Sequence, residues 1–173
     1  VISWDRKHYE YPDNPKNIQI TQFHNPIIPD GQVSCYRNDG SQFTVNLTQV
    51  HIEEDAAKLM HEKKISLVDF NKAGVPLIEI VTEPCVRNIE DASTYAQYIQ
   101  RIVQNLGISE ANLEKGEFKS DVSVSLRKKH SYELNPRTEI KNLNSFKFMV
   151  EALKEEVEKQ FNYYIKHKEF RPD

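Results

Sequence analysis

Two segments of the sequence carry carboxylates in strand-like patterns that suit a divalent metal ion. In the first, Glu139 and Lys141 are two positions apart, so in a strand they share one face while Ile140 points to the other. In the second, residues 50–56 read Val-His-Ile-Glu-Glu-Asp-Ala, and Glu54 follows an alternating run. Carboxylate oxygens are the ligands that hard cations prefer. Together the two segments suggest a metal site.

The alternation predicts which of these carboxylates point toward apolar neighbours. In a strand over 44–54, alternate side chains share a face, which groups Val50, Ile52 and Glu54 against Gln49, His51 and Glu53. Glu79 likewise stands between apolar residues on the same face of its own strand. A carboxylate in such surroundings is rarely buried unless it is paired or binds a metal. Glu54 and Glu79 are therefore candidates, with a structural ion pair or hydrogen bonds to the backbone as alternatives.

Length and composition are those of an ordinary globular domain. The chain has 173 residues, 38% hydrophobic and 28% charged, which is enough for one domain with a core. The formal net charge of −3 does not favour an extended nucleic-acid surface. No apolar run reaches the ~20 residues of a membrane span, and no signal pattern opens the chain, so we expect a soluble protein. Cys35 and Cys85 form no Cys-x-x-Cys motif, and two free thiols are expected.

Strand and loop patterns cover the first half of the chain. Residues 5–16 are rich in Tyr, Lys, Asp and Pro, which predicts a loop. Residues 65–70 and 75–83 are typical of two strands, and the glycine-containing connection 71–74 has the length of a hairpin. A strand over 118–127 alternates strictly and leaves a second polar face that includes Asp121.

Helix signals follow. Asn88 and Asp91 resemble a capping pair, apolar residues then recur at helical spacing, and Gly107 ends the pattern. A second amphipathic helix begins after Ser145. The predicted fold is α+β, a mostly antiparallel sheet with at least two helices on one face and a polar opposite face. Solvation is the default explanation for any single residue on that face.

Seven motifs are spread over nearly the whole chain. They are DRKHY at 5–9, YPDNPK at 11–16, QITQF at 19–23, HIEEDA at 51–56, LVDFN at 67–71, GVPLIEIVTEP at 74–84 and TEIKNLNSF at 138–146. In these residues and in their order, the chain resembles the GatB family, the B subunits of glutamyl/aspartyl-tRNA amidotransferase.

The resemblance implies a catalytic cradle domain related to glutamine synthetase, in which an antiparallel sheet supplies acidic metal ligands. It also implies a ligase that uses glutamine as the amido donor. ATP, with Mg²⁺, phosphorylates the side-chain carboxylate of Glu-tRNA(Gln) or Asp-tRNA(Asn), and ammonia from the partner amidase GatA displaces the phosphate. The small subunit GatC completes the implied complex, and no membrane is involved.

Carried over onto matching positions, the resemblance makes Glu54 and Glu139 the catalytic metal ligands. The alternative for Glu139 is an ion pair with Lys141, which is more often structural. Three residues fall where the family lines its ammonia passage, and a solvated loop is their alternative; they are Lys7, Tyr9 and Lys16. Glu79, Asp121 and Lys141 are weaker site candidates, and His51 is expected to be a strand residue rather than a ligand.

The chain departs from the family pattern over 114–121. Asp121 is kept, but Lys119 replaces an arginine and loses its bidentate geometry. Residues 1–173 are expected to be part of a cradle domain, without the family's N-terminal metal-binding segment, its zinc cysteines or its C-terminal tRNA-binding tail. We therefore expect the isolated chain to be inactive and to bind tRNA weakly.

Other function classes stay open. One is a non-catalytic assembly module that docks an amidase subunit, and another is the archaeal relative GatE. An unrelated divalent-metal phosphohydrolase would favour clustered His and Asp rather than scattered Glu. The composition is compatible with a bacterial cytoplasm, a mitochondrion or a plastid.

Overall fold

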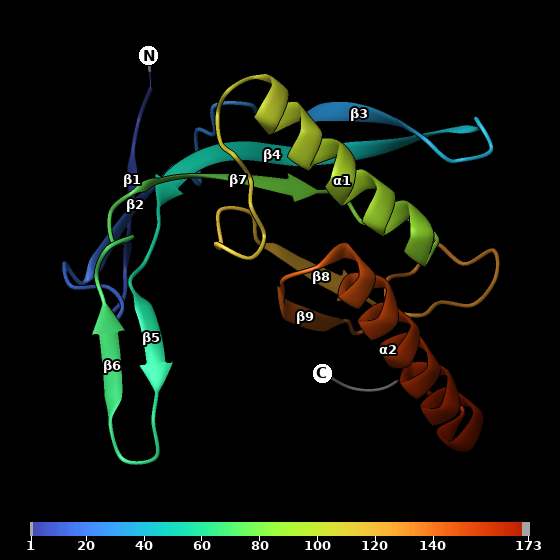
Figure 1. Cartoon of the computed structure of the whole chain (residues 1–173). Helices are drawn as coiled ribbons and strands as arrows, with labels where there is room; N and C mark the ends of the chain where they lie inside the picture. The colour runs from blue at the N-terminus through green and yellow to red at the C-terminus, as the bar shows by residue number, and fades with distance from the viewer. Residues whose placement is uncertain (1, 171–173) are drawn as a thin grey trace. The chain divides into compact units, whose positions relative to one another are not determined.

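The computed structural model describes residues 2–170, which form two compact units (Figure 1). The units comprise residues 2–34 with 44–85, and residues 35–43 with 86–170. Val1 and 171–173, the ends of the predicted domain, lie outside the described residues. Within these residues, antiparallel strands occur together with two helices, which confirms the α+β class. No helix in the described part of the chain is long and apolar enough to cross a membrane.

The strands described in the first half of the chain make three small antiparallel sheets. Their bounds are β1 Asp5–His8, β2 Ile18–Thr21, β3 Gly31–Tyr36, β4 Gln42–Glu54, β5 Lys58–His61, β6 Ser66–Asp69 and β7 Pro76–Thr82. β1 pairs with β2, β5 pairs with β6, and the third sheet has the order β3-β4-β7. β1 lies inside the segment predicted to be a loop, so that prediction is wrong for its first residues; pairing with β2 supplies hydrogen bonds that the local sequence does not announce.

The predicted hairpin of 65–70 with 75–83 is also wrong. β6 pairs with β5 and β7 pairs with β4, so the two segments belong to different sheets. The reason lies in the connection: Gly74 has φ 79, and the backbone of Asp55 exchanges hydrogen bonds with Gly74 and Val75 at 2.9 and 2.8 Å. These bonds align the start of β7 with the end of β4.

The second unit contains both helices and one two-stranded sheet. Its elements are α1 Ile89–Asn105, β8 Ser120–Val124, β9 Thr138–Leu143 and α2 Phe146–His167. The cap predicted for α1 is confirmed, since Asn88 accepts from the Asp91 amide at 2.7 Å. The helix predicted after Ser145 is present as well, and Ser145 caps it by accepting from the Phe148 amide at 3.2 Å. Gly107 follows α1 with φ 66, as a helix end requires.

One core holds this unit together. Ala96 of α1, Leu143 of β9, and Met149 and Leu153 of α2 are buried, and Val122, Val124 and Ile140 pack against them. The helices therefore cover one face of the β8-β9 sheet, as predicted, and alternation leaves Asp121, Glu139 and Lys141 on the other. The predicted single sheet is wrong, because strands of four to seven residues separated by turns divide the described residues into four sheets; β4 is the only longer described strand.

A bidentate ion pair ties the turn between β3 and β4 to the start of α1 within the second unit. Arg37 Nε and Nη2 donate to the two carboxylate oxygens of buried Asp91 at 2.7 and 2.8 Å. The Arg37 guanidinium also lies 4.8 Å from the centroid of the Phe43 ring. Such a planar fork is a geometry that lysine does not reproduce.

Candidate functional site

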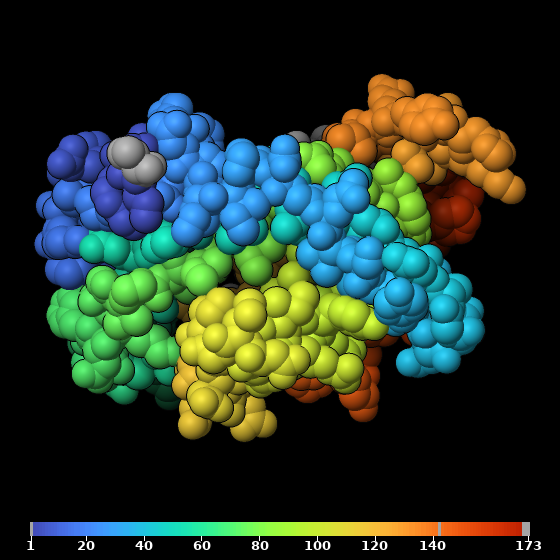
Figure 2. Space-filling model, turned by 90° about the horizontal axis from the view of Figure 1, so that it is seen from above, coloured from blue at the N-terminus to red at the C-terminus, as the bar shows by residue number. Residues whose placement is uncertain are grey.

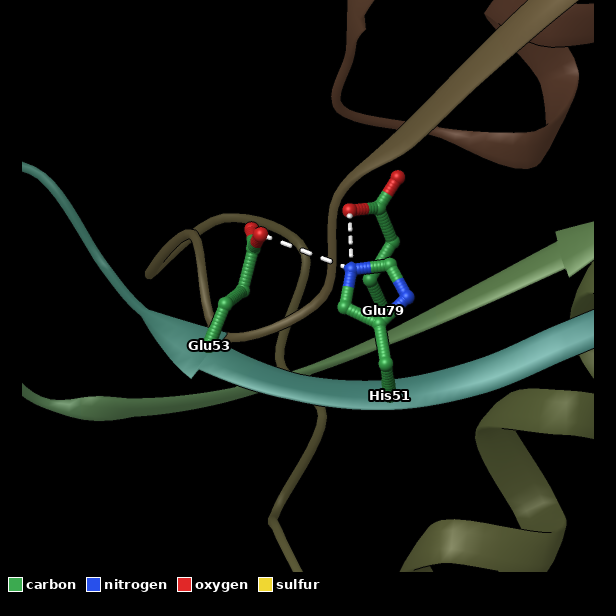
Figure 3. A group of neighbouring side chains, drawn as sticks. All are labelled: His51, Glu53 and Glu79. Carbon is green, nitrogen blue, oxygen red and sulfur yellow. Dashed lines mark ion pairs between the residues drawn. The ribbon is translucent and has the colours of Figure 1, made fainter. Parts of the chain in front are cut away.

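The β4-β7 pair of the first unit brings three potential metal ligands together on one face. His51 is directly opposite Glu79 in the register, and Glu53 follows His51 on the same side of β4. His51 Nε2 lies 3.1 Å from Glu79 Oε2 and 3.5 Å from Glu53 Oε2 (Figure 3). One donor atom from each of the three lies within 4.8 Å of the others. Both carboxylates turn toward the imidazole in Figure 3, so the three groups converge on one point.

The three side chains of this cluster differ in their exposure to solvent. The side chains of His51 and Glu53 are 7% and 15% exposed, whereas that of Glu79 is 50% exposed. Burial and the neighbouring Glu79 raise the pKa of Glu53, and His51 opposes that rise. Glu79 is thus not the buried carboxylate that its apolar neighbours indicated, because β7 is the outer strand of its sheet. The cluster is a shielded carboxylate and imidazole with one carboxylate open to solvent.

The side chain of Gln49 holds the imidazole from the opposite side. Its Nε2 lies 3.2 Å from His51 Nδ1, and if that amide donates, the ring proton is on Nε2, facing both carboxylates. In this tautomer His51 donates to the carboxylates rather than acting as a ligand. The prediction that His51 is a strand residue is confirmed by its place in β4.

Two residues predicted for the ammonia passage lie near the cluster. The Lys7 ammonium is 5.5 Å from the centroid of the Tyr9 ring, and its charge lowers the pKa of Glu53 against the rise described above. Burial, then the charges of Asp13 and Glu53, raise the pKa of Tyr9. Asp13 Oδ1 is buried and has no hydrogen-bond partner among the described residues. The side of the cluster near Lys7 and Tyr9 therefore holds a further oxygen acceptor without a donor.

Glu54 points to the opposite face of β4, as the alternation predicts. Both its oxygens accept from Lys16 Nζ, at 2.7 and 2.6 Å, and Oε2 also accepts from the Ile20 amide at 3.2 Å. The Lys16 hydrogen bond is the main cause of a lowered pKa for Glu54. The structural ion pair, one of the two interpretations of this residue, is therefore present. A metal ion at Glu54 would have to displace Lys16.

The other predicted residues lie in the second unit. Lys141 Nζ is 3.1 Å from Glu139 Oε2, and the charges of Glu139 and Asp121 raise the pKa of Lys141. All three side chains are exposed on the face of the sheet away from the helices. Glu54 and Glu139 belong to different units, so the prediction that they share one cation stays a prediction.

Sequence reasoning placed His51 and Glu53 on one strand face but did not select them. Alternation along β4 was the available signal. Alternation along one strand does not identify the neighbouring strand, and the predicted hairpin paired β7 with β6. Only the register of β7 against β4 brings Glu79 next to His51 and Glu53.

The donor set fits a hard divalent cation. Glu53 and Glu79 offer carboxylate oxygens of the kind that Mg²⁺ and Mn²⁺ bind, and His51 can orient them through its Nε2 proton. The half-exposed Glu79 leaves this side of the cluster open to solvent, which suits a cation that keeps several of its waters, as Mg²⁺ does.

Comparisons with known proteins identify the family of the chain. Residues 1–173 match the GatB/GatE catalytic domain. The chain is 46% identical over 164 residues to the B subunit of the aspartyl/glutamyl-tRNA(Asn/Gln) amidotransferase of Chlamydia muridarum, covering 95% of this chain and 33% of that protein. The protein of the same name from Helicobacter pylori is 48% identical over 155 residues, covering 90% and 32%. The chain thus spans about a third of the length of these relatives. It belongs to the GatB/GatE catalytic domain family.

Proposed function

We propose that this chain is a catalytic part of the B subunit of a tRNA-dependent amidotransferase. In the proposed reaction, the γ-phosphoryl group of ATP is transferred to the side-chain carboxylate of glutamate on tRNA(Gln), or of aspartate on tRNA(Asn). Ammonia then displaces phosphate and leaves the amide. The names of the relatives, which specify these tRNAs and one subunit of several, support the substrate and a multi-subunit complex. GatA as amidase and GatC as small subunit are the partners proposed.

The observation that carries this proposal is the convergence of His51, Glu53 and Glu79. A carboxylate is a poor electrophile, and Mg²⁺, when bound, neutralises phosphate oxygens so that phosphoryl transfer can proceed. Glu53 and Glu79 would hold the cation, and His51, whose Nε2 lies 3.5 Å from Glu53 Oε2 and 3.1 Å from Glu79 Oε2, would fix the direction of both carboxylates. The burial of Glu53 keeps it from turning into solvent.

The residues around this cluster have separate proposed roles. Lys7 lies close enough to Glu53 to lower its pKa, and the charge of Glu53 raises the pKa of Tyr9; these two residues line the path by which ammonia reaches the activated carboxyl. Lys16 donates to both carboxylate oxygens of Glu54, which also accepts from the Ile20 amide. The proposed role of Lys16 is therefore to position the segment that leads into β2 rather than to contact ammonia. Asp121, Glu139 and Lys141 offer an exposed polar face for substrate.

The test compares carboxylates on the two faces of β4 in the full-length protein with its partners. E53Q and E79Q each remove a charge while keeping the side-chain shape, and E54Q is the matched control. ATP-dependent phosphorylation of Glu-tRNA(Gln) should fall at least ~100-fold in E53Q and E79Q, while glutamine hydrolysis by the partner continues. E54Q should retain phosphorylation.

The opposite result would favour a different site. Loss of phosphorylation in E54Q, with full phosphorylation in E53Q and E79Q, would place the cation with Glu54 and Glu139, as the sequence alone predicts. Full phosphorylation in all three variants, in assembled complexes, would reject a metal site on β4 and support the assembly-module alternative. Gel filtration of each complex separates these outcomes from misfolding.

A further inference from the structure

The loop between β8 and β9 is basic although the whole chain is acidic. Residues 127–137 contain four cations against the single carboxylate of Glu133, within a chain of net charge −3. The cations are Arg127, Lys128, Lys129 and Arg137. In Figure 1 the orange segment swings out beyond the ends of the two strands, and in Figure 2 orange atoms form part of the visible surface. The loop 127–137 is therefore a local basic surface on a chain whose net charge is negative.

An aromatic ring stands among these cations. Tyr132 is 92% exposed, the highest value among the large hydrophobic side chains of the described residues. The Arg127 guanidinium lies 6.0 Å from its ring centroid. Keeping a tyrosine ring almost wholly in water leaves one complete π-face without a neighbour, and such a face is available for stacking.

Three of the four loop cations form no ion pair within the described residues. Elsewhere lysines pair with carboxylates, as Lys16 does with Glu54 and Lys159 with Glu155. Within residues 2–170, none of the ion pairs involves Lys128, Lys129 or Arg137, and all three side chains are exposed. Their charge is thus available to an anionic partner.

Hydrogen bonds fix the loop at its base and at its turn. Asn135 Nδ2 donates to the Leu126 carbonyl at 2.9 Å, which closes the base of the loop. The Ser131 amide donates to the Lys128 carbonyl at 3.0 Å, and the left-handed His130, with φ 66, completes that turn. A loop held in this way presents its side chains without a large ordering cost on binding.

We propose that residues 127–137 bind an unpaired segment of RNA. Lys128, Lys129 and Arg137 contact phosphates, and a base stacks on Tyr132 with Arg127 beside the ring. Cations interleaved with an exposed aromatic ring are the arrangement by which proteins hold single-stranded nucleic acid. An anionic membrane fits less well, because the loop has no amphipathic helix and Leu134 is its only exposed aliphatic side chain. That the RNA is the aminoacyl-tRNA substrate rests on the proposed function.

The test measures binding of a tRNA transcript to the full-length protein in its complex, by filter retention between 50 and 200 mM salt. K128A/K129A should weaken binding and lower the slope of log affinity against log salt by about 2. Y132A should weaken binding at least ~5-fold with an unchanged slope, and Y132F should match the wild type. K63A/K64A, which removes two exposed lysines from the turn between β5 and β6, is the matched control and should change nothing.

Contrary results separate this inference from the proposed function. Wild-type affinity and slope in K128A/K129A and in Y132A would overturn the RNA contact, whatever the amidation assay shows. Loss in Y132F equal to that in Y132A would overturn stacking. Binding to phosphatidylserine vesicles that depends on Tyr132, with RNA binding unaffected, would assign the loop to a membrane instead. If the complex does not amidate tRNA at all, the proposed function fails, yet these binding measurements still decide the role of the loop.

Discussion

Replacing Gln160 by leucine should loosen the β8-β9 sheet, because one buried amide holds both strands. Gln160 lies in α2 and is 6% exposed. Its Nε2 lies 3.1 Å from the Val124 carbonyl, 3.3 Å from Thr138 Oγ1 and 2.9 Å from Glu156 Oε1. Its Oε1 accepts from the Leu126 amide at 3.2 Å. Leucine has a similar volume but satisfies none of these groups.

The expected cost follows from the groups left without partners. An unsatisfied buried donor or acceptor costs about 1–3 kcal/mol. The Leu126 amide and the Val124 carbonyl each lose this partner, and both residues are only partly buried, so the lower part of that range applies to each. The local free energy of opening should therefore fall by about 2–4 kcal/mol, which corresponds to roughly 30- to 800-fold.

Hydrogen exchange of amides in β8 and β9 is the appropriate assay, because it reports local opening rather than global unfolding. In Q160L these amides should exchange faster by that factor, whereas α1 amides change little. E158L, which places leucine on the exposed side of the same helix, is the control and should leave β8 and β9 protected. Unchanged exchange of β8 and β9 in Q160L would refute the anchoring of the sheet by this side chain.

Three further predictions concern stability. R37K keeps the charge but loses the fork to buried Asp91, so the first turn of α1 should exchange about 10-fold faster; equal protection would contradict the bidentate role. M149A should lower the free energy of unfolding of the second unit by about 2–5 kcal/mol in denaturant titration, and a loss below about 1 kcal/mol would contradict its place in the core. Because Lys16 lowers the folded-state pKa of Glu54, their pair stabilises above the unfolded-state pKa, near ~4.3, and loses this effect as the pH falls through the folded-state value. Wild type and E54Q should therefore differ in stability at neutral pH, by at most about 1 kcal/mol, and converge in acid; a difference that grows in acid would contradict this sign.

The helices could be predicted from the sequence because their signals are local. Asn88 and Asp91 cap α1 three residues apart, Gly107 ends it, and Ser145 caps α2. Each signal depends on neighbours within one or two turns. Strand pairing depends on partners far along the chain, so the partner of β7 was assigned to the nearest strand instead of β4.

The candidate site shows the same difference between local signals and long-range contacts. Alternation along β4 correctly set Glu54 apart from His51 and Glu53, since the period of two is a property of the strand itself. It could not show that Lys16 reaches back to Glu54, or that Glu79 arrives opposite His51. Both contacts join segments more than twenty residues apart, and no pattern within either segment announces them.

Binding of Mn²⁺ as a paramagnetic substitute for Mg²⁺ tests the metal site on β4 most directly. Electron paramagnetic resonance can count bound ions in the full-length wild type, in E53Q/E79Q and in E54Q. We predict that the wild type binds an ion that Mg²⁺ displaces, that E53Q/E79Q loses it, and that E54Q retains it. An ion retained by E53Q/E79Q and lost in E54Q would contradict the assignment of the metal to the face of β4 that carries His51, Glu53 and Glu79.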